Sequence, residues 1–182
     1  MIKALLQFTV MGAIASRQAS TVGFSLKNGF SVLKTNNSYN PIKSIFDQLS
    51  SIENFLSSVQ DPSSCQRLIK VIEDMDKCSL QDLGFSQFQI SRLRENQCCT
   101  IYSSPLFDIS VFIICKGKGL PVHNHPSMAV LSKVVCGELN VRSYTPKDYK
   151  KSIVGAQEIP VTLALNGVKT ASDSPWFLTP SS

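Results

Sequence analysis

The chain has no apolar run long enough to cross a membrane and no paired cysteine motif. A membrane-spanning helix needs roughly 18 or more consecutive apolar residues, and no stretch of the 182 residues reaches that length. Six cysteines are present, but none forms a C-x-x-C, which excludes a zinc ribbon or a thioredoxin-type site. Isolated buried thiols are the simpler interpretation of Cys115 and Cys136.

Acidic residues are missing from the first 46 positions, before Asp47. This stretch holds five of the 18 basic residues, so the remainder carries 13 basic and 13 acidic residues, although the whole chain has a net charge of +5. A basic domain surface that would bind nucleic acid is therefore not expected.

The acid-free start is typical of a targeting segment, and residues 1–38 are interpreted as a targeting or disordered leader. A mitochondrial presequence is favoured. A cytosolic extension that is never cleaved and a secretory signal with Ala13-Ile14-Ala15 as its cleavage site are the alternatives. The expected location is mitochondrial or cytoplasmic.

Beyond the leader, the pattern predicts helices first and strands afterwards. Asn40-Pro41 is a helix start, and apolar residues recur at helical spacing from Ile42 to Val59. A second helix follows Asp61-Pro62, with Leu68, Ile69, Ile72 and Met75 on its apolar face. Residues 39–98 are predicted to form a helical part and residues 99–182 a partial β-barrel, in one protein that is mainly β with N-terminal helices.

Short strands and turns are predicted throughout the second part. The predicted strands are Thr100–Tyr102, Ile109–Cys115 with both faces apolar, Ala129–Cys136, Glu138–Tyr144 with Leu139, Val141 and Ser143 facing inward, and a last strand from Pro175. Asn166-Gly167, between Val161–Leu165 and Val168–Thr170, predicts a hairpin with a type I′ turn.

Histidine occurs only twice, at His123 and His125. In a β-strand alternate side chains face the same way, so these two imidazoles could share one metal ion. Two histidines held only by hydrogen bonds within a sheet are the alternative. A zinc hydrolase ranks low, because no candidate base stands beside the pair.

The spacing of Gly117, His123-x-His125 and Gly137 resembles the first cupin motif. Neither Ala129 nor Val130 can supply the glutamate usual in that motif, which points to three-histidine thiol dioxygenases. Residues 120–128, with Leu131–Val134 behind them, closely resemble the cysteamine (2-aminoethanethiol) dioxygenase and plant cysteine oxidase family. Supporting matches are Asp82-Leu83-Gly84, Ser143-Tyr144 and Leu178-Thr179-Pro180, and the resemblance runs from about residue 42 to the C-terminus.

The resemblance implies a cupin-like (jelly-roll) β-barrel and an enzyme that binds Fe(II) through three histidines. Such an enzyme inserts both atoms of O2 into a thiol, either cysteamine or the N-terminal cysteine of a peptide, to give a sulfinic acid. Its implied partners are that thiol or peptide and dioxygen, with no nucleic acid and no membrane span, and the protein is expected to be a monomer.

The third histidine of that family has no counterpart in this sequence. It would follow Leu178-Thr179-Pro180, where only Ser181-Ser182 remain, so only His123 and His125 carry over as metal ligands. The barrel is thus expected to be incomplete at its C-terminal end, as in a truncated product. A carboxylate could replace the missing ligand, with Glu138 and Asp173 as candidates. The alternative function is a non-catalytic cupin-like pseudoenzyme or interaction protein.

Overall fold

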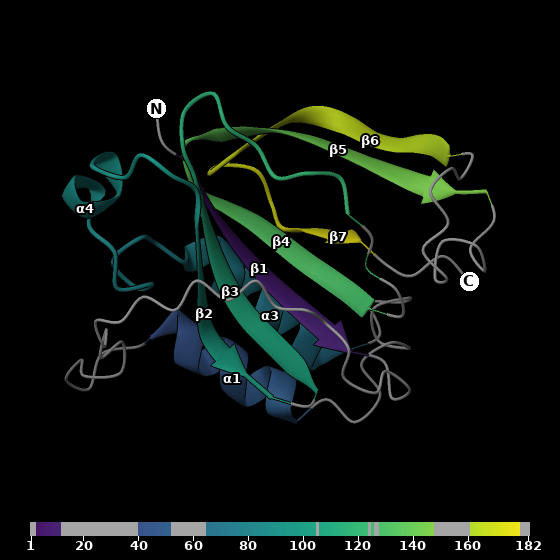
Figure 1. Cartoon of the computed structure of the whole chain (residues 1–182). Coiled ribbons are helices and arrows are strands. Elements are labelled where there is room, and N and C mark those ends of the chain that lie inside the picture. Colours follow the sequence, from purple (N-terminus) through teal and green to yellow (C-terminus); the bar gives the residue numbers. More distant parts are fainter. Residues whose placement is uncertain are drawn as a thin grey trace.

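The computed structural model describes residues 3–11, 40–51, 65–104, 106–123, 125, 128–147 and 161–178. These residues form two antiparallel sheets and three helices (Figure 1). Within this part of the chain, none of the helices has the length and apolar character required to cross a bilayer. The protein is mainly β and cupin-like, and its two sheets remain open as in an incomplete barrel.

The larger sheet has five strands in the order β2-β3-β1-β4-β7. Their bounds are β1 Lys3–Met11, β2 Gln97–Ser103, β3 Phe107–Ile114, β4 Met128–Cys136 and β7 Trp176–Leu178. The smaller sheet pairs β5 Glu138–Pro146 with β6 Val161–Thr170. Figure 1 shows this pair on the side of β4 and β7 that lies away from the helices.

Strand β1 is the largest difference from the sequence interpretation. Its residues were placed in a leader outside the domain, whereas they form the central strand of the larger sheet, paired with β3 on one side and β4 on the other. Ala4 and Leu6 are fully buried, so the apolar start supplies core side chains. Residues 1–2 and 12–38 lie outside the described residues, and their targeting role stays a prediction.

Helix α1, Pro41–Ser50, begins where Asn40-Pro41 predicts. Asn40 Oδ1 accepts hydrogen bonds from the backbone N–H groups of Ile42, at 2.9 Å, and Lys43, at 3.3 Å. Pro41 occupies the first turn, where its missing N–H removes no helical hydrogen bond. The continuation predicted toward Val59 falls outside the described residues after Ser51.

Replacing Asn40 with alanine is expected to lower the free energy of unfolding by about 1 kcal/mol, because two N–H groups of the first turn lose their acceptor. Urea denaturation of the two proteins measures the difference. Asn40→Asp is the matched control, since a carboxylate accepts the same bonds and should restore most of the stability. An alanine variant as stable as the parent would contradict this cap.

Helix α3, Gln66–Lys77, packs beside α1 and buries Leu68, Val71 and Met75. The capping residues predicted at 61–64 lie outside the described residues, and Cys65 stands at the N-cap. A short helix that the sequence did not predict, α4 Gln87–Ser91, begins with a capping box in which Ser86 and Gln89 exchange hydrogen bonds.

The core lies between the five-stranded sheet and helices α1 and α3. It combines helix residues such as Ile45 and Leu68 with alternate residues of the strands, including Leu6, Ile109 and Leu131. Strand β3 alternates between buried apolar residues and half-buried residues that include Asp108 and Ser110. The prediction that both faces of this strand are apolar is therefore wrong for its first half, because its second face lies away from the helical core.

A buried ionic contact ties the helices to the sheet. Lys133 of β4 is 3% exposed, and its Nζ lies 2.9 Å from Asp76 Oδ1 of α3. The same ammonium group donates to the backbone oxygen of Asp173 in the turn before β7. Lys133 therefore joins three elements and has a structural role.

The Asn166-Gly167 hairpin prediction is wrong. Strand β6 runs without interruption through both residues, with Asn166 paired to Arg142 and Gly167 to Val141 of β5. Gly167 is not among the glycines with positive φ, which a type I′ turn requires. Pairing along the whole of β5 outweighs the local turn preference. Leu139, Val141 and Ser143 are half-buried between exposed neighbours, as predicted.

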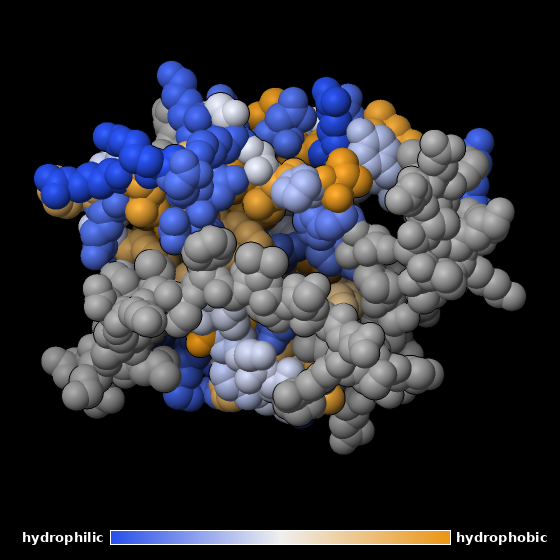
Figure 2. Space-filling model, in the orientation of Figure 1, coloured by the Kyte–Doolittle hydropathy of each residue, from blue (hydrophilic) through white to orange (hydrophobic). Residues whose placement is uncertain are grey.

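The outer face of the β5–β6 pair exposes several apolar side chains. Leu163 and Val168 are more than half exposed, and Tyr144 is 39% exposed opposite Leu163. Figure 2 shows apolar patches among hydrophilic side chains over this region. Apolar residues scattered over a surface are normal, so these residues alone define no binding site.

Candidate metal centre

His123 and His125 lie in the segment that connects β3 to β4. The described residues of this segment are irregular, so the prediction that strand alternation aligns the two rings is wrong. The rings nevertheless lie together, with centroids 4.7 Å apart and planes at 74°. The backbone N–H of Met128, the first residue of β4, donates to the carbonyl oxygen of His125 at 3.3 Å. The sheet therefore anchors one end of the pair.

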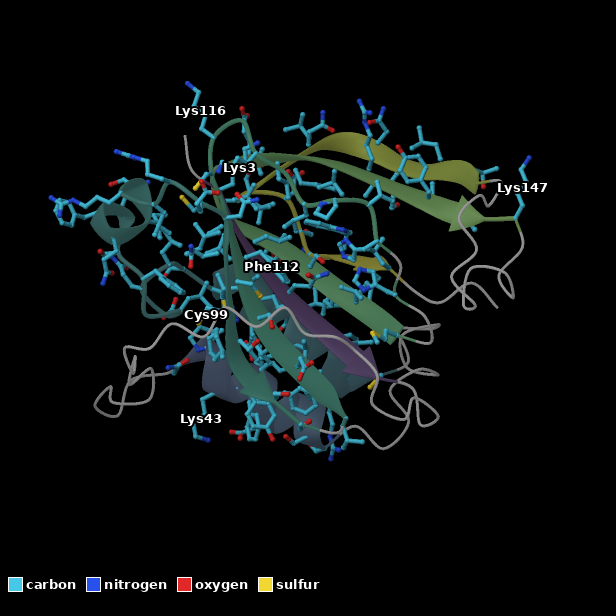
Figure 3. All side chains as sticks on the ribbon, in the orientation of Figure 1. Lys3, Lys43, Cys99, Phe112, Lys116 and Lys147 are labelled. Atoms are coloured by element: carbon cyan, nitrogen blue, oxygen red, sulfur yellow. The ribbon has the colours of Figure 1, made fainter. Side chains whose placement is uncertain are left out.

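Asn96 anchors the other end of this segment. Its Oδ1 accepts from the backbone N–H of Cys115 at 3.0 Å, and its Nδ2 donates to the carbonyl oxygen of Gly119 at 3.0 Å. The predicted turn lies between these two points, with Gly117 at a φ of +76°. Lys116 is labelled at this turn in Figure 3. Nothing in the spacing around the histidines indicated Asn96, because it lies in a different part of the sequence.

The hydrogen bond of His123 suits a metal ligand. Its Nδ1 lies 2.8 Å from the carbonyl oxygen of Pro121, which can only accept, so Nδ1 carries the proton. In a neutral ring Nε2 then keeps its lone pair and is free to bind a metal. The side chain is exposed, which leaves Nε2 accessible.

His125 is half-buried and is neutral at physiological pH. Burial, with a further contribution from neighbouring His123, lowers the pKa of His125 from 6.5 to about 4. A neutral imidazole is the form that binds transition metals. The ring of His125 can therefore act as a donor without losing a proton first.

Lowering the pH should destabilise the metal-free protein through His125. Because its pKa is near 4 in the folded chain and 6.5 in the unfolded chain, the unfolded chain binds the proton first as the pH falls. The free energy of unfolding should therefore decline between about pH 6.5 and pH 4, with no contribution from this group above that range. Urea denaturation across this range, compared with His125→Gln, measures the effect. Equal pH slopes in the two proteins would contradict it.

No third donor joins the histidines among the described residues. Within that part of the chain, no group of three or more histidine, cysteine, aspartate or glutamate residues could hold a metal ion. Glu138 is exposed at the start of β5. Asp173 accepts from the N–H and the Oγ1 of Thr170, and these bonds lower its pKa. Two imidazoles fit two positions around a divalent metal, and neither carboxylate is placed to fill a third.

A polar row crosses the face of the larger sheet that lies away from the helices. The strand register places one residue from each strand side by side, in the order Thr100, Ser110, Gln7, Ser132 and Trp176. Gln7 and Ser132 are buried.

Two buried polar atoms on this face, Asp108 Oδ1 and Trp176 Nε1, have no hydrogen-bond partner within the described part of the chain. Sequence reasoning missed this polar row. Asp108 and Ser110, two polar residues in an otherwise apolar strand, could have indicated it. The side chain of Trp176 is half-buried.

Cys78, Cys98, Cys99, Cys115 and Cys136 form no disulfide bond. Cys115 is buried and Cys136 is half-buried, with the Cys136 thiol beside Gln87 Oε1. Burial, with smaller contributions from Asp82 and Asp74, raises the pKa of Cys78 to about 12. A thiol with so high a pKa stays protonated, so Cys78 is not a candidate ligand or nucleophile.

These observations define the class of protein as an incomplete cupin-like barrel with two adjacent imidazoles in the segment before β4. The PCO_ADO family model matches residues 69–182, which include both histidines and strands β2 to β7. The chain belongs to this family of thiol dioxygenases.

One curated relative is plant cysteine oxidase 2 of Arabidopsis thaliana, which is 39% identical to this chain over 44 residues. The aligned part covers 24% of this chain and 16% of that protein. The chain thus matches only a small share of the relative's length. No solved structure gives a significant match.

Proposed function

We propose that this protein is a thiol dioxygenase-like protein in which His123 and His125 bind Fe(II). The adjacent rings carry this proposal, because the hydrogen bond of His123 Nδ1 directs its Nε2 away as a donor and burial keeps the His125 ring neutral. Nitrogen donors of this kind bind ferrous iron and other divalent first-row metals. Membership of a thiol dioxygenase family supports iron among these metals.

The reaction proposed is the conversion of a thiol to a sulfinic acid with dioxygen as the only oxidant. Bound iron supplies the redox chemistry that this family uses. Both oxygen atoms end on sulfur, and the electrons that sulfur loses reduce dioxygen, so no further reductant is needed. Cysteamine and the N-terminal cysteine of a peptide are the proposed substrates. The likeness to plant cysteine oxidase 2 supports a cysteine-containing substrate.

Iron content and sulfinate formation test the proposal directly. The purified chain is loaded anaerobically with Fe(II), freed of excess metal, and incubated with oxygen and either cysteamine or a peptide that begins with cysteine. We expect bound iron and a product that has gained two oxygen atoms, both from isotopically labelled dioxygen. Iron-free protein without product would contradict the proposal.

Removing one ligand provides the residue-level test. His125→Ala should weaken metal binding at least about tenfold, because a direct ligand contributes more than the outer partners whose loss costs 10–100-fold. Isothermal titration with Co(II), which resists oxidation in air, measures the affinity. Ser110→Ala is the control, since it lies on the sheet outside the histidine segment and should leave the affinity unchanged. Equal affinities for the parent and His125→Ala would exclude His125 as a ligand.

A non-catalytic metal-binding or interaction protein is the second candidate. The sequence contains two histidines in all, and the described residues bring no third donor to them. Two imidazoles with water in the other positions bind metal more weakly than three. Metal bound through His123 and His125 without any sulfinate formed would favour this function over the dioxygenase.

A further inference from the structure

Strand β1 pairs with a neighbouring strand along both of its edges. On one side β1 pairs with β3 from Lys3↔Ile114 to Val10↔Phe107, and on the other with β4 from Ala4↔Cys136 to Met11↔Met128. Figure 1 shows β1 between these two strands along nearly its whole length. Without β1, both strands would lose the partners of their backbone N–H and C=O groups in the middle of the domain.

The composition of β1 suits this position. From Ala4 to Met11 the strand carries no charge. Ala4 and Leu6 have no solvent exposure, and Leu5 and Gln7 are buried on the other face of the strand. The one charged residue, Lys3, is half-buried at the end of the sheet where β3 finishes, near Lys116 (Figure 3). The strand therefore matches an interior site on both of its faces.

The far end of β1 lies beside the C-terminal end of the segment that carries the two histidines, where β4 begins. Met11 pairs with Met128, and the N–H of Met128 bonds to the carbonyl oxygen of His125. Strand β7 reaches only as far as Val130, so Met128 and Ala129 have β1 as their ladder partner within the described residues. The backbone of Met128 thus links His125 to β1.

The link between β1 and the rest of the chain carries a candidate cleavage site. The sequence between Met11 and Asn40 includes Ala13-Ile14-Ala15, a small-x-small pattern that starts two residues after the strand. Cleavage there would remove the covalent connection of β1. The strand would then stay only through its ladders and its buried side chains.

We propose that residues 3–11 occupy a strand-binding site between β3 and β4, remain there in the functional protein, and hold the His123–His125 pair in its metal-binding position. The metal-binding part of this inference rests on the proposed function. Among the three interpretations of residues 1–38, it favours an extension that is retained, because removing β1 would open the sheet at its centre.

A cut made after folding tests whether the strand is bound. A specific protease sequence replaces part of residues 20–30, and the folded full-length protein is then cleaved there. We expect the N-terminal fragment to co-elute with the remainder in size-exclusion chromatography, and Co(II) affinity to equal that of the uncut protein. Separation of the fragment with no change in Co(II) affinity would overturn the inference.

A chain that begins at residue 16 tests the link to the histidines. We expect its Co(II) affinity to fall at least about tenfold, as for loss of a group that positions a ligand. A synthetic peptide of residues 1–12 should restore it. The same peptide with Leu6→Asp should not, because it would bury a carboxylate in an apolar core, whereas a Lys3→Gln peptide should still act. Full Co(II) affinity in the shortened chain without peptide would overturn the inference.

Hydrogen exchange separates this inference from the proposed function. If the uncut full-length protein binds no Co(II), the proposed function fails. The strand site is then judged by peptide-dependent protection of the amides of β3 and β4. A stable dimer that exchanges labelled N-terminal strands would assign the occupant to a second copy, and this outcome would overturn the assignment to the same chain.

Discussion

Replacing Leu6 with alanine is expected to lower the free energy of unfolding by about 2–5 kcal/mol, because Leu6 is fully buried and the shorter side chain leaves a cavity. Leu6 belongs to the same core cluster as residues of α1, α3 and β3. Its contacts therefore extend across the sheet-helix interface. Urea denaturation followed by circular dichroism measures the change.

The matched control is Leu163→Ala on strand β6. Leu163 is 55% exposed, so the same change in side chain should cost no more than about 0.5 kcal/mol. If the first residues formed a leader outside the domain, the two variants would behave alike. Equal stabilities of Leu6→Ala and the parent would therefore reject β1 as a core strand.

Replacing Asp74 with alanine is expected to cost about 1.5–3 kcal/mol, the range for losing a hydrogen bond to a charged group. Asp74 of α3 has no solvent exposure. Its Oδ1 lies 2.9 Å from Lys70 Nζ, and its Oδ2 accepts from Ser44 Oγ of α1 at 2.5 Å. The variant would lose both the ion pair and the hydrogen bond that joins the two helices.

Asp47→Ala is the control variant for Asp74→Ala. Asp47 pairs with Lys43 at 2.7 Å on the surface of α1, and both side chains are at least half exposed. A surface pair of this kind contributes at most about 1 kcal/mol. Thermal unfolding of the two variants should therefore separate them clearly. A loss of stability in Asp74→Ala no greater than in Asp47→Ala would show that the buried carboxylate does not join the helices.

Helices α1 and α3 and most strands could be predicted because their signals are local. Asn40-Pro41 specifies a helix start through its own side-chain hydrogen bonds and the missing N–H of proline. Gly117 and Gly137 mark turns because both adopt positive φ, which glycine tolerates best. Alternation in β5 predicted which side chains face inward. In each case the physical cause lies within a few residues.

The arrangement of the site could not be predicted because its causes lie far apart in the sequence. The rings of His123 and His125 meet in an irregular segment that Asn96 and β4 hold at its two ends. Asn166-Gly167 has a strong local turn preference, but β5 offers a complete partner for β6 and the pairing prevails. Likewise, the sequence of β1 shows only an isolated apolar run, because nothing in it indicates that β3 and β4 are its partners.

The central position of β1 has a consequence for the order of folding. Lys3 pairs with Ile114 and Met11 with Met128, so 111 and 117 positions separate these partners in the sequence. During synthesis the first strand must wait until more than half of the chain has emerged before its ladders can close. Such distant contacts slow folding and leave apolar segments unpaired in the meantime. The nascent chain should therefore depend on chaperones for longer than its 182 residues suggest.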